Sequence, residues 1–585
     1  MHTDALMPRG ARYWLRSCVL LLILTVTMPA FSQQPADPAD PVEKLSAALW
    51  TKFQPRELDA GLAFRKELIT KHAADLRSTD ELGRALLLKG WYVNYGSPVN
   101  AVDLAVRAEI ASRFRKAVEA ELRGGNPAAQ RTTATFVGEL ASTAQDGGQI
   151  AEFAREQLSE LAPALAKLTE NKNPETVAVA ARALGKIQPE PIIAVPVLQR
   201  LFSIEDVKVR RAAAGALSEM IQVAIKHDSS RTRTEPLRIF PPTAQFVIPA
   251  AAAGLANADG YVRLRCLEAI RDTARAMADD VRGPYGPNAF PPPGKPLTED
   301  ERAEIKRAIA YAKAIQARTQ PLQAAFTKQT PALIKSLAHA DPATSAAAAD
   351  ALEAIGSTRQ RALRLYASVS NLDLVVKLEP ETDALGDALR PAAPALAKNL
   401  AHKEERLQLA SLYALETLSD LATPAIPQLV KALSDANAYV RWGAVRVLGR
   451  MAPEGAEQAV PGLTLLVKDK NEYVRTTTLL VLARYGPGAK AAVPALRESA
   501  GDSDARFRVL AIRALEAAGP ASAPAVPELV KALTAAEAEV RLASACALAK
   551  LGPLAAPAAA ALRQALNDPN AAVRLAASRT LLLMK

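Results

Sequence analysis

The sequence predicts an all-α fold in which helical hairpins stack one on the next as a superhelical solenoid. Three observations predict this class. Prolines recur every 33 or 34 residues, at Pro394, Pro427, Pro461, Pro494 and Pro527. Arginines recur at the same spacing, at Arg441, Arg475, Arg508, Arg541 and Arg574. Apolar residues four positions apart lie between these markers, so each helix has an apolar face that only stacked neighbours can bury.

Residues 425–453, AIPQLVKALSDANAYVRWGAVRVLGRMAP, show how one unit is built. Pro427 falls in the first turn of the first helix, where its missing N–H is harmless. The SDANA segment interrupts the helix with Asp, Asn and small residues. A second helix begins near Tyr439. Its buried face is predicted from residues four apart, Val440, Ala444 and Leu448.

This unit resembles HEAT repeats, in particular the short HEAT-like units first named for phycobilisome lyases. About eleven units fit the pattern, and they start near residues 113, 161, 194, 247, 330, 394, 425, 459, 492, 525 and 557. The unit at 394 departs from it, because Leu407 and Gln408 stand where Val and Arg are expected. The resemblance implies an armadillo-type superhelix in which the second (B) helices line the concave side.

The predicted organisation follows from these units and the segments between them. It comprises a signal peptide at 1–32, a Pro/Asp linker at 33–42, an N-terminal helical cap at 43–112, degenerate HEAT-like repeats at 113–274 with a loop insertion at 227–245, a Pro-rich loop and charged helix at 275–329, a HEAT-like repeat at 330–356, an irregular joint at 357–392 and regular HEAT repeats at 393–585.

The first residues have the order of a secretory signal peptide. Three arginines precede an apolar run at 18–27, and the small residues Ala30 and Ser32 suit cleavage before Gln33. An uncleaved N-terminal anchor is the alternative. Since no later run of about 18 apolar residues was found, we expect a soluble protein in the periplasm, the cell envelope or the extracellular space.

The cysteines bear on whether a disulfide stabilises the chain, and the net charge bears on the kind of partner it binds. Cleavage leaves Cys266 and Cys546, 280 residues apart in an extended array, so we expect no mutual disulfide. The formal charge is +11, and residues 1–32 contribute three arginines and one aspartate, so the remainder has a charge near +9. That balance favours anionic partners without identifying one.

The most regular polar pattern is an Asp–Arg ladder, in which an acid precedes an arginine by six residues. Its members are Asp435 and Arg441, Asp469 and Arg475, Asp502 and Arg508, and Asp568 and Arg574. Asp206 with Arg210 and Asp259 with Arg263 are looser versions. We expect each arginine to bond the acid of its own or an adjacent turn, which is a structural role. On this basis Arg475→Ala should cost about 1–3 kcal/mol.

A second basic pattern lies five and nine residues after each ladder arginine, on one face of the B helix. Its members are Arg446, Arg450, Arg484, Arg513, Lys550 and Arg579. They are candidate partner-binding residues in an anion-facing groove. The alternative is a solvated helix face whose cations complement the helix dipole.

No catalytic or cofactor motif is present in the sequence. The five histidines, His2, His72, His227, His339 and His402, lie far from one another and from cysteines. His339 and His402 are expected to be solvated turn residues. We therefore expect no enzyme activity, no cofactor and no metal site.

The favoured function is an exported, non-catalytic scaffold that binds a protein or an anionic envelope polymer through the concave face. A lyase-like or other enzyme accessory factor stays open, suggested only by the name of the repeat family. A nucleic-acid-binding HEAT protein is the third possibility, which export disfavours. The sequence leaves open the partner's identity, the oligomeric state and the order of the insertions.

Overall fold

The computed structural model describes residues 115–116, 118–124, 126–143, 158–229, 240–280, 298–370, 383–451 and 456–584. Contacts divide the chain into two units, Met1–Ile110 and Ala111–Lys585, and the described residues belong to the second. The predicted signal peptide, linker and N-terminal cap lie outside the described residues. So do residues 230–239 and 281–297 of the predicted insertions and 371–382 of the joint.

Throughout these ranges the chain forms helices and turns with no strand, which confirms the all-α superhelical fold class. The B helices are α7 (Pro127–Thr143), α10 (Pro174–Lys186), α12 (Val207–Ser229), α14 (Gly260–Asp280), α16 (Pro342–Ser370), α19 (Glu405–Leu418), α21 (Ala438–Arg450), α23 (Glu472–Tyr485), α25 (Ala505–Ala518), α27 (Ala538–Leu551) and α29 (Ala571–Leu583). Each of them belongs to one of the predicted units.

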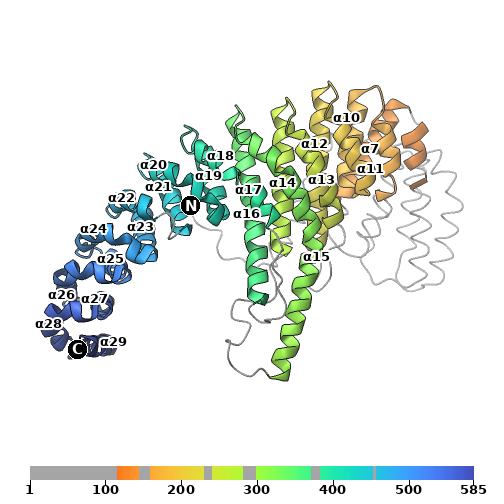
Figure 1. Ribbon diagram of the computed structural model, residues 1–585. Coiled ribbons are helices and arrows are strands. Elements are labelled where there is room, and N and C mark those ends of the chain that lie inside the picture. Colours follow the sequence, from red (N-terminus) through yellow and green to blue (C-terminus); the bar gives the residue numbers. More distant parts are fainter. Residues whose placement is uncertain are drawn as a thin grey trace, which may run out of the picture. The chain divides into compact units, whose positions relative to one another are not determined.

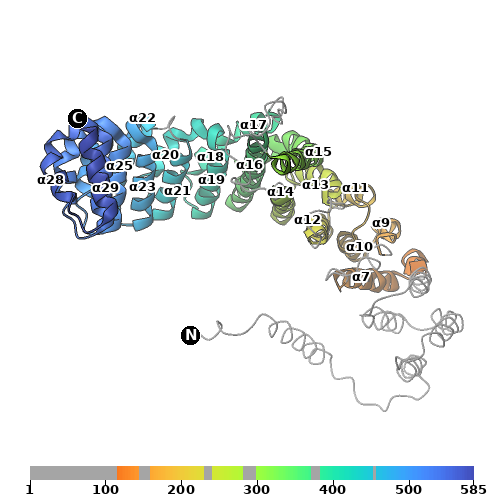
Figure 2. The same ribbon diagram turned by 90° about the horizontal axis from the view of Figure 1, so that it is seen from below.

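The first (A) helices of the hairpins form the other layer. They are α9 (Ala162–Leu168), α11 (Pro191–Leu201), α13 (Phe240–Gly254), α15 (Glu299–Ser336), α18 (Ala392–Asn399), α20 (Ile426–Ala432), α22 (Ala456–Leu466), α24 (Val493–Ser499), α26 (Val526–Ala532) and α28 (Ala559–Ala565). From α10 onward, each B helix packs on the B helix of the next unit (Figure 1). Figure 2 shows α18, α20 and α22 in one row and α19, α21 and α23 in the other.

Local sequence explains where several of the C-terminal B helices begin and end. The side chain of Asn437 accepts a hydrogen bond from the N–H of Tyr439 at 2.8 Å, and equivalent caps begin α23, α25 and α29. Gly486, Gly519 and Gly552 end α23, α25 and α27 with φ between 55° and 63°, a conformation that glycine adopts without strain.

Short 3-10 helices then lead from those glycines to the next A helix. They are η3 (Gly486–Ala492), η4 (Gly519–Ala525) and η5 (Gly552–Ala558), and η2 (Ser419–Ala425) takes the same place after α19. Ser419 stands at the glycine position of that junction, with φ 47°. Each junction from one hairpin to the next in the C-terminal units therefore consists of a residue with positive φ followed by a short 3-10 helix.

The hairpin of α15 and α16 is longer than its neighbours. The charged segment and the first helix of the repeat at 330 form one continuous helix, so the expected boundary at residue 329 falls inside α15. A capping box between Thr298 and Glu301 begins this helix. Likewise α16 continues past residue 356 to Ser370. Both helices project beyond the neighbouring helices (Figure 1), so the charged segment is an extension of a repeat hairpin.

One stretch of the described residues, Ala538–Ala565, is long and apolar enough to cross a membrane by length and composition. It comprises α27, η5 and α28, and Gly552 with its positive φ separates the first two elements. It thus repeats the hairpin junction of the neighbouring units, and the basic residues Arg541, Lys550 and Arg563 interrupt its apolar residues.

Candidate binding surface

The ladder arginines connect neighbouring units. The Nε and Nη2 atoms of Arg441 donate to the carboxylate of Asp469 in the next unit, both at 2.8 Å. Its Nη1 donates to the backbone oxygens of Asp435 and Ala436 in its own turn, at 2.8 and 3.0 Å. Arg541 repeats this geometry with the carboxylate of Asp568 at 2.7 and 2.9 Å. The sequence allowed each ladder arginine to bond the acid of its own turn or that of an adjacent turn. In the structure, Arg441 and Arg541 bond the carboxylate of the adjacent turn.

Asp469 is nearly buried, with 7% of its side chain exposed. Burial alone would raise its pKa, but the hydrogen bonds from Arg441 and from the N–H of Asn471 outweigh burial, so the pKa lies below its usual value. The Asp469 side chain therefore holds the turn of its own unit and the arginine of the preceding one.

Three units vary the ladder for visible reasons. Gln408 replaces the arginine in the 394 unit, and its Nε2 donates to Asp435 at 3.3 Å. Ala535 replaces the turn acid in the 525 unit, so Arg508 pairs with Glu537 at 2.6 Å. Arg475 departs most, because it makes no ion pair among the described residues and its guanidinium stacks on Phe507 at 4.0 Å.

The position of Phe507 accounts for the change at Arg475. Phe507 stands directly before Arg508, where Val440 and Val474 stand before the arginines of two other units. Its larger ring lies under the Arg475 guanidinium, whose Nε is buried without a partner. The expectation that Arg475 holds a partly buried acid is therefore wrong, since the structure records no bond from Arg475 to Asp502.

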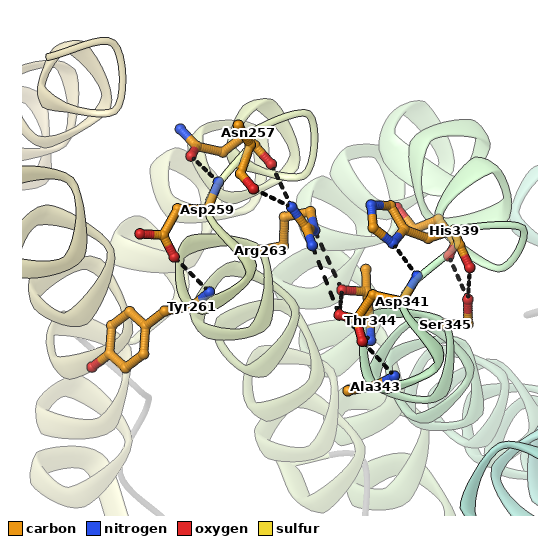
Figure 3. Close-up of polar contacts among 11 residues, drawn as sticks. Asn257, Asp259, Tyr261, Arg263, His339, Asp341, Ala343, Thr344 and Ser345 are labelled. Carbon is orange, nitrogen blue, oxygen red and sulfur yellow. Dashed lines mark hydrogen bonds and ion pairs between the residues drawn. The ribbon is translucent and has the colours of Figure 1, made fainter. Parts of the chain in front are cut away.

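Figure 3 shows the same connection in a degenerate unit. The Nη1 atom of Arg263 donates to the backbone oxygens of Asn257 and Ala258 at 2.8 and 2.9 Å. Across the unit boundary its Nε donates to the hydroxyl of Thr344 at 3.3 Å, and its Nη2 lies 3.7 Å from the carboxylate of Asp341. Arg263 thus keeps the cross-unit geometry with different acceptors, whereas Arg210, among the residues that the structure describes, bonds only to the backbone oxygens of its own turn.

Histidine occupies the turn-acid position in two units. The Nδ1 of His339 accepts a hydrogen bond from the N–H of Asp341 at 2.9 Å (Figure 3). His402 does the same with Glu404 at 3.0 Å. Asp435 makes the equivalent turn bond with Asn437 at 2.8 Å. The prediction of solvated turn residues did not include this hydrogen bond within the turn. The signal in the sequence was that His339 and His402 stand at the repeat position that Asp435 holds in its own unit.

The B face, defined as the positions five and nine residues after each ladder residue, is solvent-facing in the C-terminal units. Four of the predicted binding residues are exposed there, Arg484, Arg513, Lys550 and Arg579. In the described part of the chain these four make no ion pair within 4.0 Å. The positions form a row that crosses α23, α25, α27 and α29.

The other two predicted binding residues are compensated. Arg446 is half-buried and lies 2.7 Å from Glu416, and Arg450 lies 3.4 Å from the same side chain. The guanidinium of Arg446 also stacks over the ring of Trp442, at 4.5 Å. Glu416 is an acid that the sequence reading missed, although it lies eight residues after Gln408, one position before the basic register.

Glu516 is a second missed acid, eight residues after Arg508. Burial raises its pKa, and Arg513 and Lys550 oppose that rise. The carboxyl group therefore lies among cations but forms no ion pair with them within 4.0 Å in the described structure. The row keeps an excess of positive charge, since one carboxylate stands against four exposed cations.

Three acids on the same register in the more N-terminal units have basic partners. Glu268 pairs with Arg265 at 2.7 Å. Asp272 lies 2.8 Å from Arg271. Asp350 pairs with Arg406. Arg182, Lys186 and Glu219 lie on the same register and form no ion pair within 4.0 Å in the described structure. Among the described helices, four successive B helices that each carry an exposed cation without an ion pair occur only at α23, α25, α27 and α29.

No group of three or more His, Cys, Asp or Glu side chains suited to a metal ion occurs in the described ranges. Cys266 is buried and burial raises the pKa of its thiol to about 12. Cys546 is half-buried, and burial followed by the charge of Glu516 raises its pKa. Both thiols are free in the described structure.

Comparison with known proteins finds a family match and structural neighbours of low sequence identity. Three overlapping segments, 393–483, 426–516 and 493–582, match HEAT repeats. The fold is similar to an engineered protein of known crystal structure, with 19% identity and a TM-score of 0.41, over 80% of this chain and 98% of that one. It is similar to importin beta in an ammonium sulfate crystal form, with 13% identity and a TM-score of 0.42, over 93% of this chain and 64% of that one. The curated proteins contain no significant match.

The sequence matches and the contacts lead to one assignment. The matches cover residues 393–582 without a break. The bonds from an arginine to the backbone oxygens five and six residues earlier recur at Arg210, Arg263, Arg441, Arg508, Arg541 and Arg574. The hairpins stack through both regions. Residues 393–582 are therefore HEAT repeats, and the described part of the chain is an all-α superhelix of stacked helical hairpins.

Proposed function

We propose that this chain is an exported, non-catalytic scaffold that binds an anionic partner through the B face of its C-terminal units. HEAT-repeat solenoids in general bind other proteins, because stacked hairpins present a long continuous surface. The partner would lie across several B helices at once. The affinity would come from many weak contacts over a large area and from attraction between opposite charges.

One observation carries the proposal: the exposed cations Arg484, Arg513, Lys550 and Arg579 form a row without ion-pair partners. Elsewhere on the same register several charges have partners, as in the pair of Glu268 and Arg265, and the cations without one do not follow on successive B helices of the described chain. Like charges at successive positions repel one another, which makes an uncompensated row costly for folding alone. A bound anionic partner would relieve that repulsion.

Export is supported by the order of charged, apolar and small residues in 1–32. The mature protein should begin at Gln33. Sequencing the N-terminus of protein isolated from its host tests this, and an intact Met1 on protein in the cytosol would refute export without bearing on the B face.

Binding is tested with two anionic probes of different backbone, poly-L-glutamate and polygalacturonate, titrated by fluorescence anisotropy at 50 and 300 mM salt. The variant carries Arg484→Glu, Lys550→Glu and Arg579→Glu. We expect about a tenfold loss of affinity at low salt and a flatter salt dependence, because three screened attractions become repulsions.

A matched control changes the net charge equally on the other layer. Lys431, Lys531 and Arg563 are exposed on the A helices α20, α26 and α28 and form no ion pair in the described structure. Their replacement by Glu should leave affinity within about twofold, since the altered charges face away from the partner. Equal losses in the two variants, or no binding of either probe by the wild type, would contradict the proposal.

A further inference from the structure

A row of exposed uncharged side chains lies beside the cations on the B helices. Tyr439 and Tyr473 are 61% and 65% exposed, and each stands two residues before a ladder arginine, on the neighbouring helices α21 and α23. Tyr413, Leu480 and Leu575 are 44%, 52% and 72% exposed. Large apolar side chains that repeat at related positions on neighbouring units are typical of contact surfaces.

The aromatic end of this row is held in place by contacts across three units. The guanidinium of Arg446 lies 4.5 Å from the ring of Trp442 and 6.0 Å from that of Tyr413. The indole N–H of Trp442 donates to the hydroxyl of Thr477 at 3.0 Å. These contacts connect α19, α21 and α23, so the surface there is ordered before a partner arrives, which lowers the entropy cost of binding.

We infer that the B face of α21–α29 binds an extended polypeptide segment that carries an Asp or Glu at every third residue, with proline or small apolar residues between. This inference rests on the proposed function and names its partner. Neighbouring helices pack about 8–10 Å apart. An extended strand advances about 3.3 Å per residue, and a polyproline II helix has three residues per turn with a rise of about 3.1 Å. Three residues of such a segment span about the distance between neighbouring helices, so a carboxylate at every third residue would meet the cation of one unit after another.

The cations follow that path in two registers. Arg513 and Arg579 lie five residues after their ladder arginines, and Arg484 and Lys550 lie nine residues after theirs. The two registers are four residues apart, about 6 Å along a helix. Long flexible side chains span that offset, so a single extended segment reaches all four charges.

The neighbouring side chains favour a polypeptide over an anionic polysaccharide. Exposed rings such as Tyr439 and Tyr473 can stack on a sugar or on a proline and so do not discriminate, whereas the Trp442 ring already lies against the Arg446 guanidinium. Further along the row the exposed residues are aliphatic, as at Leu480 and Leu575. Aliphatic side chains suit proline and other apolar side chains between the carboxylates.

The test compares three probes on the full chain by fluorescence anisotropy. One is the fluorescein-labelled peptide (Asp-Ala-Pro)5. The second has the same composition with its five Asp residues contiguous. The third is polygalacturonate. We expect the spaced peptide to bind at least fivefold more tightly than the contiguous one, because only its carboxylates match the unit spacing.

The outcomes separate this inference from the proposed function. Equal affinity for the two peptides overturns the spacing argument, and binding of polygalacturonate with no binding of either peptide overturns the polypeptide partner while the proposed function stands. Failure of all three probes overturns both.

A second variant tests the apolar row. Replacing Tyr439 and Tyr473 with Ser should weaken the spaced peptide about fivefold at 300 mM salt, where charge attraction is screened. Tyr261 stands in the same register before Arg263 in a unit without uncompensated cations, and Tyr261→Ser is the matched control with unchanged affinity. An equal effect of the two replacements would show that the tyrosines near the cations have no special role.

Discussion

Replacing the ladder arginines of two adjacent units should have unequal consequences. Arg441→Ala removes two bonds to the Asp469 carboxylate and two to backbone oxygens. It leaves an acid whose side chain is only 7% exposed. Hydrogen bonds to charged groups contribute about 1.5–3 kcal/mol each when a buried partner is stranded. Because solvent reaches part of the Arg441 side chain, we expect a total loss of about 2–3 kcal/mol.

Arg475→Ala is the matched comparison, with the same residue type at the same position one unit later. Arg475 has only its stacking on Phe507 to lose, worth about 0.5–1 kcal/mol. A double-mutant cycle of Arg441→Ala with Asp469→Asn should give a coupling energy of about 1–2 kcal/mol.

The assay is urea denaturation followed by circular dichroism, with native-state hydrogen exchange to localise the loss to α21 and α23. Localisation matters because repeat arrays need not unfold in one step. Lys431→Ala, at an exposed position without an ion pair, is the control and should change stability by less than about 0.5 kcal/mol. If Arg475→Ala costs as much as Arg441→Ala, or if the coupling energy is near zero, the cross-unit bond is not the source of the stabilisation.

Three further predictions concern stability and reactivity. The folded chain lowers the pKa of Asp469, and it lowers that of Asp341 chiefly through the hydroxyl of Thr344. The stability that these two carboxylates contribute is therefore full above about pH 4 and is lost as the pH falls through their folded pKa values. Acid titration followed by circular dichroism should show this loss, and Asp469→Asn should make the profile flatter. Gly185→Ala should cost about 1–3 kcal/mol, because the added Cβ would lie 2.5 Å from the Cα of Ala216, whereas Gly124→Ala, with no atom within 4 Å, should cause no loss of stability in the same urea assay. Cys266, whose pKa burial raises to about 12, should resist a thiol reagent at pH 8 until the chain unfolds, and rapid native-state labelling identified by mass spectrometry would contradict its burial.

Periodicity made the hairpins predictable, but two features of the array depend on tertiary contacts. A six-residue spacing is compatible with pairing inside a turn or with the next turn, and only stacking brings Arg441 to Asp469. The exception at Arg475 follows from one enlarged side chain, Phe507, in the adjacent unit. Sequence reasoning has no rule for such a replacement, because it depends on which atoms face each other across the unit boundary.

The long hairpin differed from expectation for a local reason. Pro331 suggested a helix start near residue 330, yet in the structure Pro321 and Pro331 both lie inside α15. A proline removes one backbone hydrogen bond, and packing on neighbours can outweigh that loss. On the B face, the basic register was visible in the sequence, whereas the compensation of Arg446 and Arg450 by Glu416 required the neighbouring helix.

The uneven ladder also has a mechanical consequence. If the chain were pulled from its ends, neighbouring turns would separate first where no ladder arginine bonds a carboxylate of the next turn. The turns at the α19–α21 and α23–α25 boundaries lack that bond, because Gln408 replaces the arginine in one and Arg475 stacks on Phe507 in the other. The ion pairs of Glu416 with Arg446 and of Glu472 with Arg506 still join the helices there. The junctions at Arg441 and Arg541 would resist longer, since two bonds to one carboxylate must break together. Under tension the array would extend in steps whose order is set by single side chains at the turns.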